Sequence, residues 1–429
     1  MIPGLARIEL SRSPPPRVLA TFAVIAGPQR DQKAADRLLA DVEAEGFQAS
    51  PVYGAGGYEI RVPGLPDRAA ADKVRAALVA AGLVVAEVRE IGRDIASAEA
   101  PLRAQVLEVE PGSIAVQVAH ARDAAIGLET TRDLARRRGA IAAVNGGFFR
   151  VSGILAGESE GVLKIDGRLL SEPDRGRAGV GFFDEAGRVG AVFGRLGFCA
   201  EARLASGSGV AIDGINRERK PGEVVLYTPE LHRTTLTDPS GTEVLVSGGK
   251  VIEIRRGAGS STIPATGFVL SFAGDAGAAF EIGDPVELET RLVPRSGEGA
   301  ELWSSAHSAL GAGPLLLRGG RRVARPELES ISRVFTEARH PRTAAAARAD
   351  GTLLFVTVDG RNPDWSVGMS LPELTDLLLE LGAVDAVNLD GGGSTTMVVR
   401  GESVNRPSDP AGDRANGDAI LLFPRSAAR

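Results

Sequence analysis

The chain has very little cysteine and histidine: one cysteine, Cys199, and four histidines in 429 residues. A single cysteine excludes an intramolecular disulfide, and we expect Cys199 to be a small buried side chain. A zinc cluster is not favoured by so few soft ligands. Asp390, Asp359 and Asn145 carry hard oxygen ligands that suit a divalent cation, but no spacing demands one. We therefore predict no cofactor and no metal site.

Long apolar runs and basic runs are also missing. No stretch of ~20 apolar residues is present, so no membrane-spanning helix is expected. The opening segment "MIPGLARIELSRSPPPR" lacks the apolar core of a signal peptide, so no leader is visible. The net charge is −6, and no Lys/Arg-rich run marks a nucleic-acid surface. Composition thus supports neither a membrane span nor a nucleic-acid partner.

Glycine is abundant, with 54 residues against a usual ~7% of a chain. This excess favours many turns and close backbone approaches over helical bundles. A length of 429 residues implies two or three domains, and a 43% hydrophobic content is enough for a large core. We expect an α+β or mixed α/β protein.

Residues 17–92 predict a small domain with the element order βαββαβ. The strand "RVLATFAVIAG" precedes the helix "DQKAADRLLADVEAEG", and two short strands, "FQASPVYG" and "GYEIRVPG", precede the second helix and the last strand. This order is that of a ferredoxin-like domain. Residues 1–16, which include part of "SPPPR", are expected to be a linker or the remnant of a leader.

Residues 100–429 predict a larger, strand-rich domain with mixed sheets. "QVLEVEPGSIAVQVAHA" alternates like a hairpin around Pro111 and Gly112. Ser370, with Glu373 three residues later, predicts a capping box at a helix start. This helix separates two strands that run into Asp359 and Asp390. We expect the two acids at the ends of neighbouring parallel strands, where ligands gather.

Four polar stretches follow or interrupt apolar strands, and each could carry chemistry. They are "VNGGFF" at 144–149, "ARHPRTAAA" at 338–346, "VDGR" at 358–361 and "NLDGGGST" at 388–395. Glycine admits a substrate close to the backbone, and successive amides of a glycine turn can hold an anion. An arginine can grip a phosphate as a planar fork. Taken singly, each stretch is more typical of an ordinary turn or a surface residue, and only the four together make a functional reading as favoured as a structural one.

Together, in this order and spacing, the stretches "VNGGFF", "HPRTA", "VDGR…WSVGMSLPEL" and "AVNLDGGGST" resemble the phosphodiester glycosidase family. The closing segment "VNRPSDPAGDRANGDAILLF" is also similar to that family. The resemblance runs from about residue 100 to 425, and residues 200–330 match least. It implies a hydrolase that cleaves a sugar–phosphodiester bond, with N-acetylglucosamine as a family substrate.

The resemblance also implies which residues form the site. The catalytic candidates come from all four stretches and from a loosely matched acid after the first one: Asn145, Glu158, Arg342, Asp359 and Asp390. The substrate-binding candidates lie beside them: Gly146, His340, Thr343, Arg361, Gly391, Gly392, Gly393 and Ser394.

The roles that we expect follow from the chemistry of a phosphodiester leaving group. Its charge must be neutralised while an oxocarbenium-like transition state is supported. We expect Arg342 and the amides of 391–393 to hold the phosphate, with Asp359 or Asp390 as nucleophile or base. Which acid acts, and whether configuration is retained, stays open.

Two other functions stay open. One is an ordinary glycoside hydrolase or phosphodiesterase acting on cell-wall polymer, and the other is a non-catalytic glycan-binding envelope protein. The βαββαβ unit, with "ATFAVIAG" and "GYEIRVPG", resembles the SPOR domain, a peptidoglycan-binding module of bacterial envelope proteins. That resemblance implies a cell-envelope or extracellular location and a carbohydrate partner.

Overall fold

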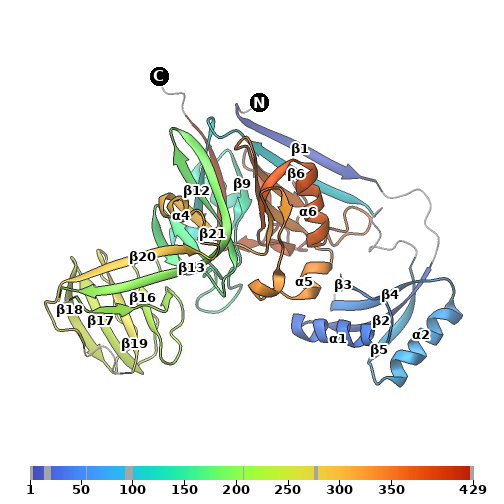
Figure 1. Cartoon of the computed structure of the whole chain (residues 1–429), viewed down its shortest axis with the longest axis horizontal. Coiled ribbons are helices and arrows are strands. Elements are labelled where there is room, and N and C mark those ends of the chain that lie inside the picture. Colours follow the sequence, from blue (N-terminus) through green and yellow to red (C-terminus); the bar gives the residue numbers. More distant parts are fainter. Residues whose placement is uncertain are drawn as a thin grey trace.

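The protein is described by a computed structural model, which covers residues 3–13, 21–54, 56–91, 100–205, 207–274 and 279–425. Figure 1 shows three parts: a small N-terminal domain at one end, a central body, and a lobe of strands at the other end. Strands outweigh helices in the body and the lobe. The predicted mixed class of helices and several sheets is confirmed.

The N-terminal domain has the predicted βαββαβ order. Its elements are β2 (Thr21–Gln29), α1 (Gln32–Ala44), β3 (Ser50–Gly54), β4 (Gly57–Leu65), α2 (Arg68–Ala80) and β5 (Val85–Ile91). The strands form one antiparallel sheet in the order β3-β4-β2-β5. Leu39 and Val42 of α1 pack against Val24 and Ile60 of the sheet. The helices therefore cover one face of a ferredoxin-like sheet.

Part of the segment that we expected to be a linker is a strand. Residues Leu5–Arg12 form β1, which pairs antiparallel with β6 (Leu102–Val109) along its whole length. Ile8 and Leu10 alternate with polar residues and pack on the body's core. This period-two pattern supplies one apolar face, which is sufficient for an edge strand. The expectation of a linker is wrong for these residues.

The central sheet has the order β1-β6-β25-β24-β26-β22-β23. Its remaining strands are β22 (Leu315–Arg318), β23 (Arg321–Arg322), β24 (Arg342–Arg348), β25 (Leu353–Val358) and β26 (Ala383–Asn388). Strand β24 is antiparallel to both β25 and β26, so those two run parallel but are not neighbours. Our expectation of adjacent strands is corrected in this respect. Both strands still end at the sheet edge where β24 begins.

Two layers cover the central sheet. On one face, Leu374 and Leu378 of α6 (Leu371–Glu380) pack with Ala344 and Ala346 of β24. The alternate residues of β24 face a second sheet, ordered β28-β27-β9-β30-β7. Its strands are β7 (Ile114–His120), β9 (Ala142–Asn145), β27 (Met397–Val399), β28 (Glu402–Ser403) and β30 (Asp418–Pro424). The predicted capping box of α6 is confirmed.

The turn at Pro111 and Gly112 does not close a hairpin. Strand β6 lies in the central sheet and β7 in the second sheet, so this turn carries the chain from one layer to the next. Strand β6 is buried over most of both faces, whereas β7 has the exposed Gln117 on one face, and the alternation of apolar residues fits a strand in either layer. The predicted hairpin is wrong for this reason.

The long strand β13 (Arg188–Leu204) connects the body to the strand lobe. Its first half pairs with β12 and its second half with β20 and β14. This third sheet contains β10 (Leu163–Ile165), β11 (Arg168–Ser171), β12 (Ala178–Glu185), β14 (Gly209–Ala211), β20 (Val286–Pro294) and β21 (Ser308–Gly311). The lobe sheet contains β15 (Gly214–Ile215), β16 (Val224–Tyr227), β17 (Gly241–Ser247), β18 (Lys250–Arg256) and β19 (Gly267–Ala273).

Short elements complete the body. They are η1 (Ala121–Asp123), β8 (Glu129–Thr130), α3 (Thr131–Arg138), α4 (Ala300–Ser305), η3 (Pro326–Glu329), α5 (Arg333–Glu337), η4 (Gly392–Ser394) and β29 (Ala415–Asn416). Figure 1 shows α5 beside α1 of the N-terminal domain. No described helix is long and apolar enough to cross a membrane.

Candidate functional site

Asn145 joins three of the predicted stretches. It is buried at the end of β9, and its Nδ2 donates to the carbonyl of Asp390 at 2.8 Å. Its Oδ1 accepts from Thr343 Oγ1 at 2.8 Å and from the amide of Thr396 at 3.1 Å. Both polar atoms of the side chain are hydrogen-bonded to protein groups. Asn145 and Thr343 therefore hold the strand ends together.

Asp390 lies two residues after the end of β26 and is only partly buried. Its amide donates to Gly146 O at 3.1 Å, and its Oδ1 accepts from the amide of Gly391 at 2.9 Å. Desolvation raises the pKa of its carboxyl to about 6, against the opposing effects of the Ser394 hydroxyl and the Arg414 charge. A carboxyl group with this pKa changes charge close to neutral pH, as acid–base catalysis requires.

Asp359 has a different environment. It is buried, its Oδ2 accepts from Trp365 Nε1 at 2.8 Å, and its Oδ1 accepts from the amide of Arg406 at 3.0 Å and Asn405 Nδ2 at 3.3 Å. Burial raises the pKa of this carboxyl, and these hydrogen bonds oppose the rise. Asn405 also donates to Thr395 O at 3.0 Å. Asp359 thus orders the segment next to the glycine loop.

Arg342 points away from the glycine loop. Its guanidinium is buried and donates to three backbone carbonyls, those of Met369 at 2.9 Å, Phe335 at 2.7 Å and Ala338 at 2.8 Å. Burial lowers its pKa to about 9. Because Nε and Nη2 already donate hydrogen bonds to these carbonyls, Arg342 holds the segment between α5 and β24 in place. The geometry does not favour the expected role in phosphate binding.

The amides of the glycine loop are also largely occupied. The Gly391 amide donates to Asp390 Oδ1 at 2.9 Å. The Gly392 amide donates to Pro341 O at 2.9 Å, and the Ser394 amide donates to Gly391 O at 3.1 Å. A side chain at Gly391 would place its Cβ 2.7 Å from Pro341 O. The loop needs glycine because it passes so close to the start of β24. It is not the open amide nest that we expected.

Two arginines flank this loop instead. Arg361 Nη2 lies 2.9 Å from where a Cβ of Gly392 would be, and Arg414 Nη2 lies 2.3 Å from where a Cβ of Gly393 would be. Arg414 forms an ion pair with Asp409 at 2.7 Å and is partly exposed. Its charge lowers the pKa of the Asp390 carboxyl. Sequence reasoning missed Arg414, whose only signal was its place in the closing segment "DRANGD".

His340 is a buried neighbour of Arg361. Its Nδ1 accepts from Arg361 Nη2 at 3.2 Å, and its ring lies 5.0 Å from that of Tyr53 and 6.3 Å from that of Phe335. Burial, followed by the charges of Arg342 and Arg361, lowers the pKa of His340 well below its usual range. His340 is therefore neutral and supports Arg361.

Gly146 lies against a second missed residue, Asp418. A Cβ at Gly146 would be 2.0 Å from Asp418 Oδ1, which accepts from the amide of Gly147 at 2.7 Å. Asp418 Oδ2 accepts from Ser159 Oγ at 3.1 Å. Burial raises the pKa of the Asp418 carboxyl. The negative charge of Asp418 in turn raises the pKa of the Asp390 carboxyl. The pattern "NGD" before an apolar strand is a weak signal for such a role.

Glu158 is not brought to the carboxyl of Asp390 by any described contact. It forms an ion pair with Arg150 at 3.2 Å, and burial raises its pKa to about 7. The other charges that act on it belong to Glu172, Glu160 and Arg217. Glu158 faces the junction with the strand lobe.

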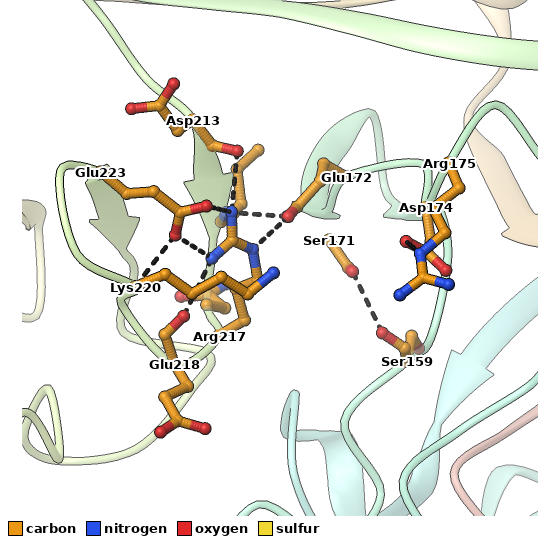
Figure 2. A network of polar contacts seen from close by, with 12 residues as sticks. Ser159, Ser171, Glu172, Asp174, Arg175, Asp213, Arg217, Glu218, Lys220 and Glu223 are labelled. Atoms are coloured by element: carbon orange, nitrogen blue, oxygen red, sulfur yellow. Dashed lines mark hydrogen bonds and ion pairs between the residues drawn. The ribbon is translucent and has the colours of Figure 1, made fainter.

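Figure 2 shows the polar network at this junction. Arg217 lies between Glu172 and Glu223, with Glu223 Oε2 at 2.5 Å, and it also donates to the carbonyl of Asp213 at 2.9 Å. Ser171 Oγ donates to Ser159 O at 3.3 Å. The Ser171 hydrogen bond holds Ser159, the neighbour of Glu158, and Ser159 in turn donates to Asp418.

A cavity of about 550 Å³ lies where the N-terminal domain meets the body. Residues 50–54 of β3 line one side, and residues 361–363 line the other. Arg361 is thus shared between the cavity and the glycine loop. Among the described residues, no group of three or more His, Cys, Asp or Glu side chains is placed to hold a metal ion.

Comparison with known proteins supports both resemblances. The family model "Phosphodiester glycosidase" matches residues 240–423, and the "SPOR domain" model matches residues 19–89. The sequence-based resemblances are confirmed over these residues. The first match begins after Asn145, Gly146 and Glu158, which therefore lie outside it.

Individual relatives match over short segments. An uncharacterized SPbeta prophage-derived protein of Bacillus subtilis is 44% identical over 84 residues, and the bovine N-acetylglucosamine-1-phosphodiester alpha-N-acetylglucosaminidase is 40% identical over 72 residues. These segments are 20% and 17% of this chain, and the chain covers 13% of the length of each relative. A solved structure from Burkholderia pseudomallei covers 98% of this chain and 94% of its own, with a TM-score of 0.72 and 28% identity.

Proposed function

We propose that this protein hydrolyses a sugar–phosphodiester bond at the anomeric carbon, with Asp390 as the reacting carboxylate. The observation that carries the proposal is the position of Asp390: partly exposed, with a pKa of about 6, beside a glycine loop flanked by Arg361 and Arg414. A negatively charged leaving group next to a carboxylate needs such cations. The match of residues 240–423 to phosphodiester glycosidases supports the same reaction.

The reaction breaks the bond between the anomeric carbon and the phosphate oxygen, and the phosphate leaves with the bonding electrons. Ionised Asp390 either attacks the anomeric carbon, forming a glycosyl ester that a water molecule then hydrolyses, or takes a proton from the water that attacks this carbon directly. Arg361 and Arg414 stabilise the phosphate charge, so no strong general acid is required. Asp359 and Asn145 hold the loop in place. The products are a free sugar and a phosphate monoester.

The substrate that we propose is a glycan or glycopolymer of the bacterial cell envelope that carries such a diester. SPOR domains are typical of bacterial envelope proteins, and residues 19–89 match this family. N-acetylglucosamine is the first sugar to test because it appears in the name of the bovine relative. In this proposal the N-terminal domain also binds peptidoglycan.

The proposal is tested by comparing two substrates of the same sugar: an N-acetylglucosamine 1-phosphodiester and an aryl N-acetylglucosaminide. We expect hydrolysis of the diester with strong preference over the glycoside. The reverse preference would indicate an ordinary glycoside hydrolase. Binding of the diester with no product formed would indicate a glycan-binding protein.

A further inference from the structure

The N-terminal domain contacts the body mainly through α5. Arg333 forms an ion pair with Glu43 of α1 at 2.5 Å, and the amide of Val334 donates to Asp36 Oδ1 at 2.7 Å. Val334 and Ala338 are fully buried and belong to the same apolar cluster as the core of the N-terminal domain. The two parts thus share a core at this point, and their relative position is fixed by packing.

A second contact reaches the candidate site. Tyr53 of β3 places its ring 4.5 Å from the guanidinium carbon of Arg361 and 5.0 Å from the ring of His340. His340 in turn accepts from Arg361 Nη2. One residue of the N-terminal domain therefore packs directly on a residue that flanks the glycine loop.

Arg361 depends on these two neighbours. Among the described residues, no carboxylate lies within ion-pair distance of its guanidinium; an aromatic face and a neutral imidazole hold it instead. Neither neighbour cancels its positive charge. The cation is consequently fixed next to Gly392 but remains available to an incoming anion.

We propose that Tyr53 is a positioning residue of the glycosidase site, through which the N-terminal domain holds Arg361 for the phosphate group of the substrate. This inference rests on the proposed function. It makes the N-terminal domain a part of the catalytic unit as well as a module for attachment. Loss of the Tyr53 ring should weaken phosphate binding without changing the chemistry at Asp390.

The test is a double-mutant cycle with Tyr53→Leu, Arg361→Ala and the double variant. KM and kcat are measured on the methyl diester of N-acetylglucosamine 1-phosphate, and Kd is measured for N-acetylglucosamine 1-phosphate. We expect Tyr53→Leu to raise KM and Kd by roughly 3–30-fold with little change in kcat. In the Arg361→Ala background the same substitution should have no further effect.

Tyr53→Phe is the matched control because it keeps the aromatic face, and it should behave as wild type. The proposal is overturned if Tyr53→Phe weakens binding as much as Tyr53→Leu, or if Tyr53→Leu is equally damaging without Arg361. If wild type binds the phosphate but does not cleave the diester, the proposed function fails while the binding cycle still reports on Tyr53 and Arg361. Absence of phosphate binding by wild type overturns the inference.

Discussion

At the scale of single residues, Asp390 should control the pH dependence of activity. Desolvation places its pKa near 6, and the proposed reaction uses its ionised form. We therefore expect kcat/KM to rise with pH and to level off above about 6. The measurement is a pH–rate profile on the diester, in which Asp390→Asn should lack the inflection. A profile that falls through pH 6 would show that the protonated form acts.

The ionised Asp390 carboxylate should lower stability, although the same ionisation raises activity. Its folded pKa of about 6 exceeds the ordinary value of 3.8, so its contribution to stability is complete at low pH and is lost as pH rises from about 4 to 6. Asp390→Asn should therefore be more stable than wild type at pH 8, by up to about 3 kcal/mol, and similar at pH 4. Urea unfolding at both pH values measures this difference. An equal difference at pH 4 and pH 8 would contradict the assignment.

Arg342 and Arg361 should respond differently to substitution. In Arg342→Lys all donors sit on one nitrogen, which cannot reach the carbonyls now bonded by both Nε and Nη2, so we expect a loss of about 1–3 kcal/mol in the free energy of unfolding. Arg361→Ala should instead raise KM for the diester, with stability changed by less than about 0.5 kcal/mol. Thermal unfolding and steady-state kinetics separate the two effects. The reverse pattern would restore Arg342 as the phosphate ligand.

The sequence alone identified which polar residues stand at strand ends, but not where their side chains point. Asn145, Thr343 and Asp390 do meet, at a point where strand ends of the two layers come together. Arg342 begins β24 at the same edge, yet it turns to backbone carbonyls that no local pattern reveals. Arg414 is brought to the loop only by the tertiary fold.

At the scale of elements, the close approaches of the glycine turns explain their composition. Gly146→Ala would place Cβ against Asp418 Oδ1, so we expect a loss of about 1–3 kcal/mol in stability and lower activity. Gly112→Ala is the matched control because its Cβ would meet nothing within 4 Å. Unfolding by urea compares the two variants. Equal effects at both positions would show that backbone flexibility, rather than crowding, decides the cost.

Local sequence patterns predicted some helices and strands but did not predict which strands pair with one another. The capping box of Ser370 and Glu373 marks the start of α6 because both partners lie within one turn. Strand pairing depends on distant segments: β24 enters between β25 and β26, and β6 and β7 separate into two layers. Alternating apolar residues are the same in every such arrangement, so the sequence pattern could not distinguish them.

At the scale of the whole molecule, docking of the N-terminal domain should contribute to stability through α5. Asp36 accepts from the amides of Arg333 and Val334 at 3.3 and 2.7 Å. Asp36→Ala should therefore lower stability by about 1 kcal/mol, as loss of a helix cap does. Asp41→Ala, an exposed position on the same helix, is the control and should be near neutral. Equal effects in thermal unfolding would contradict this account of the interface.

The most direct measurement of the central claim is the rate at which folded Asp390→Asn releases phosphate monoester from an N-acetylglucosamine 1-phosphodiester, relative to wild type and to Asp359→Asn. Loss of an acting carboxylate is expected to lower kcat by roughly 10²–10⁴-fold. Asp359→Asn, which changes a supporting group, should lose less. A folded Asp390→Asn variant with near wild-type activity would contradict the assignment of Asp390 as the reacting carboxylate.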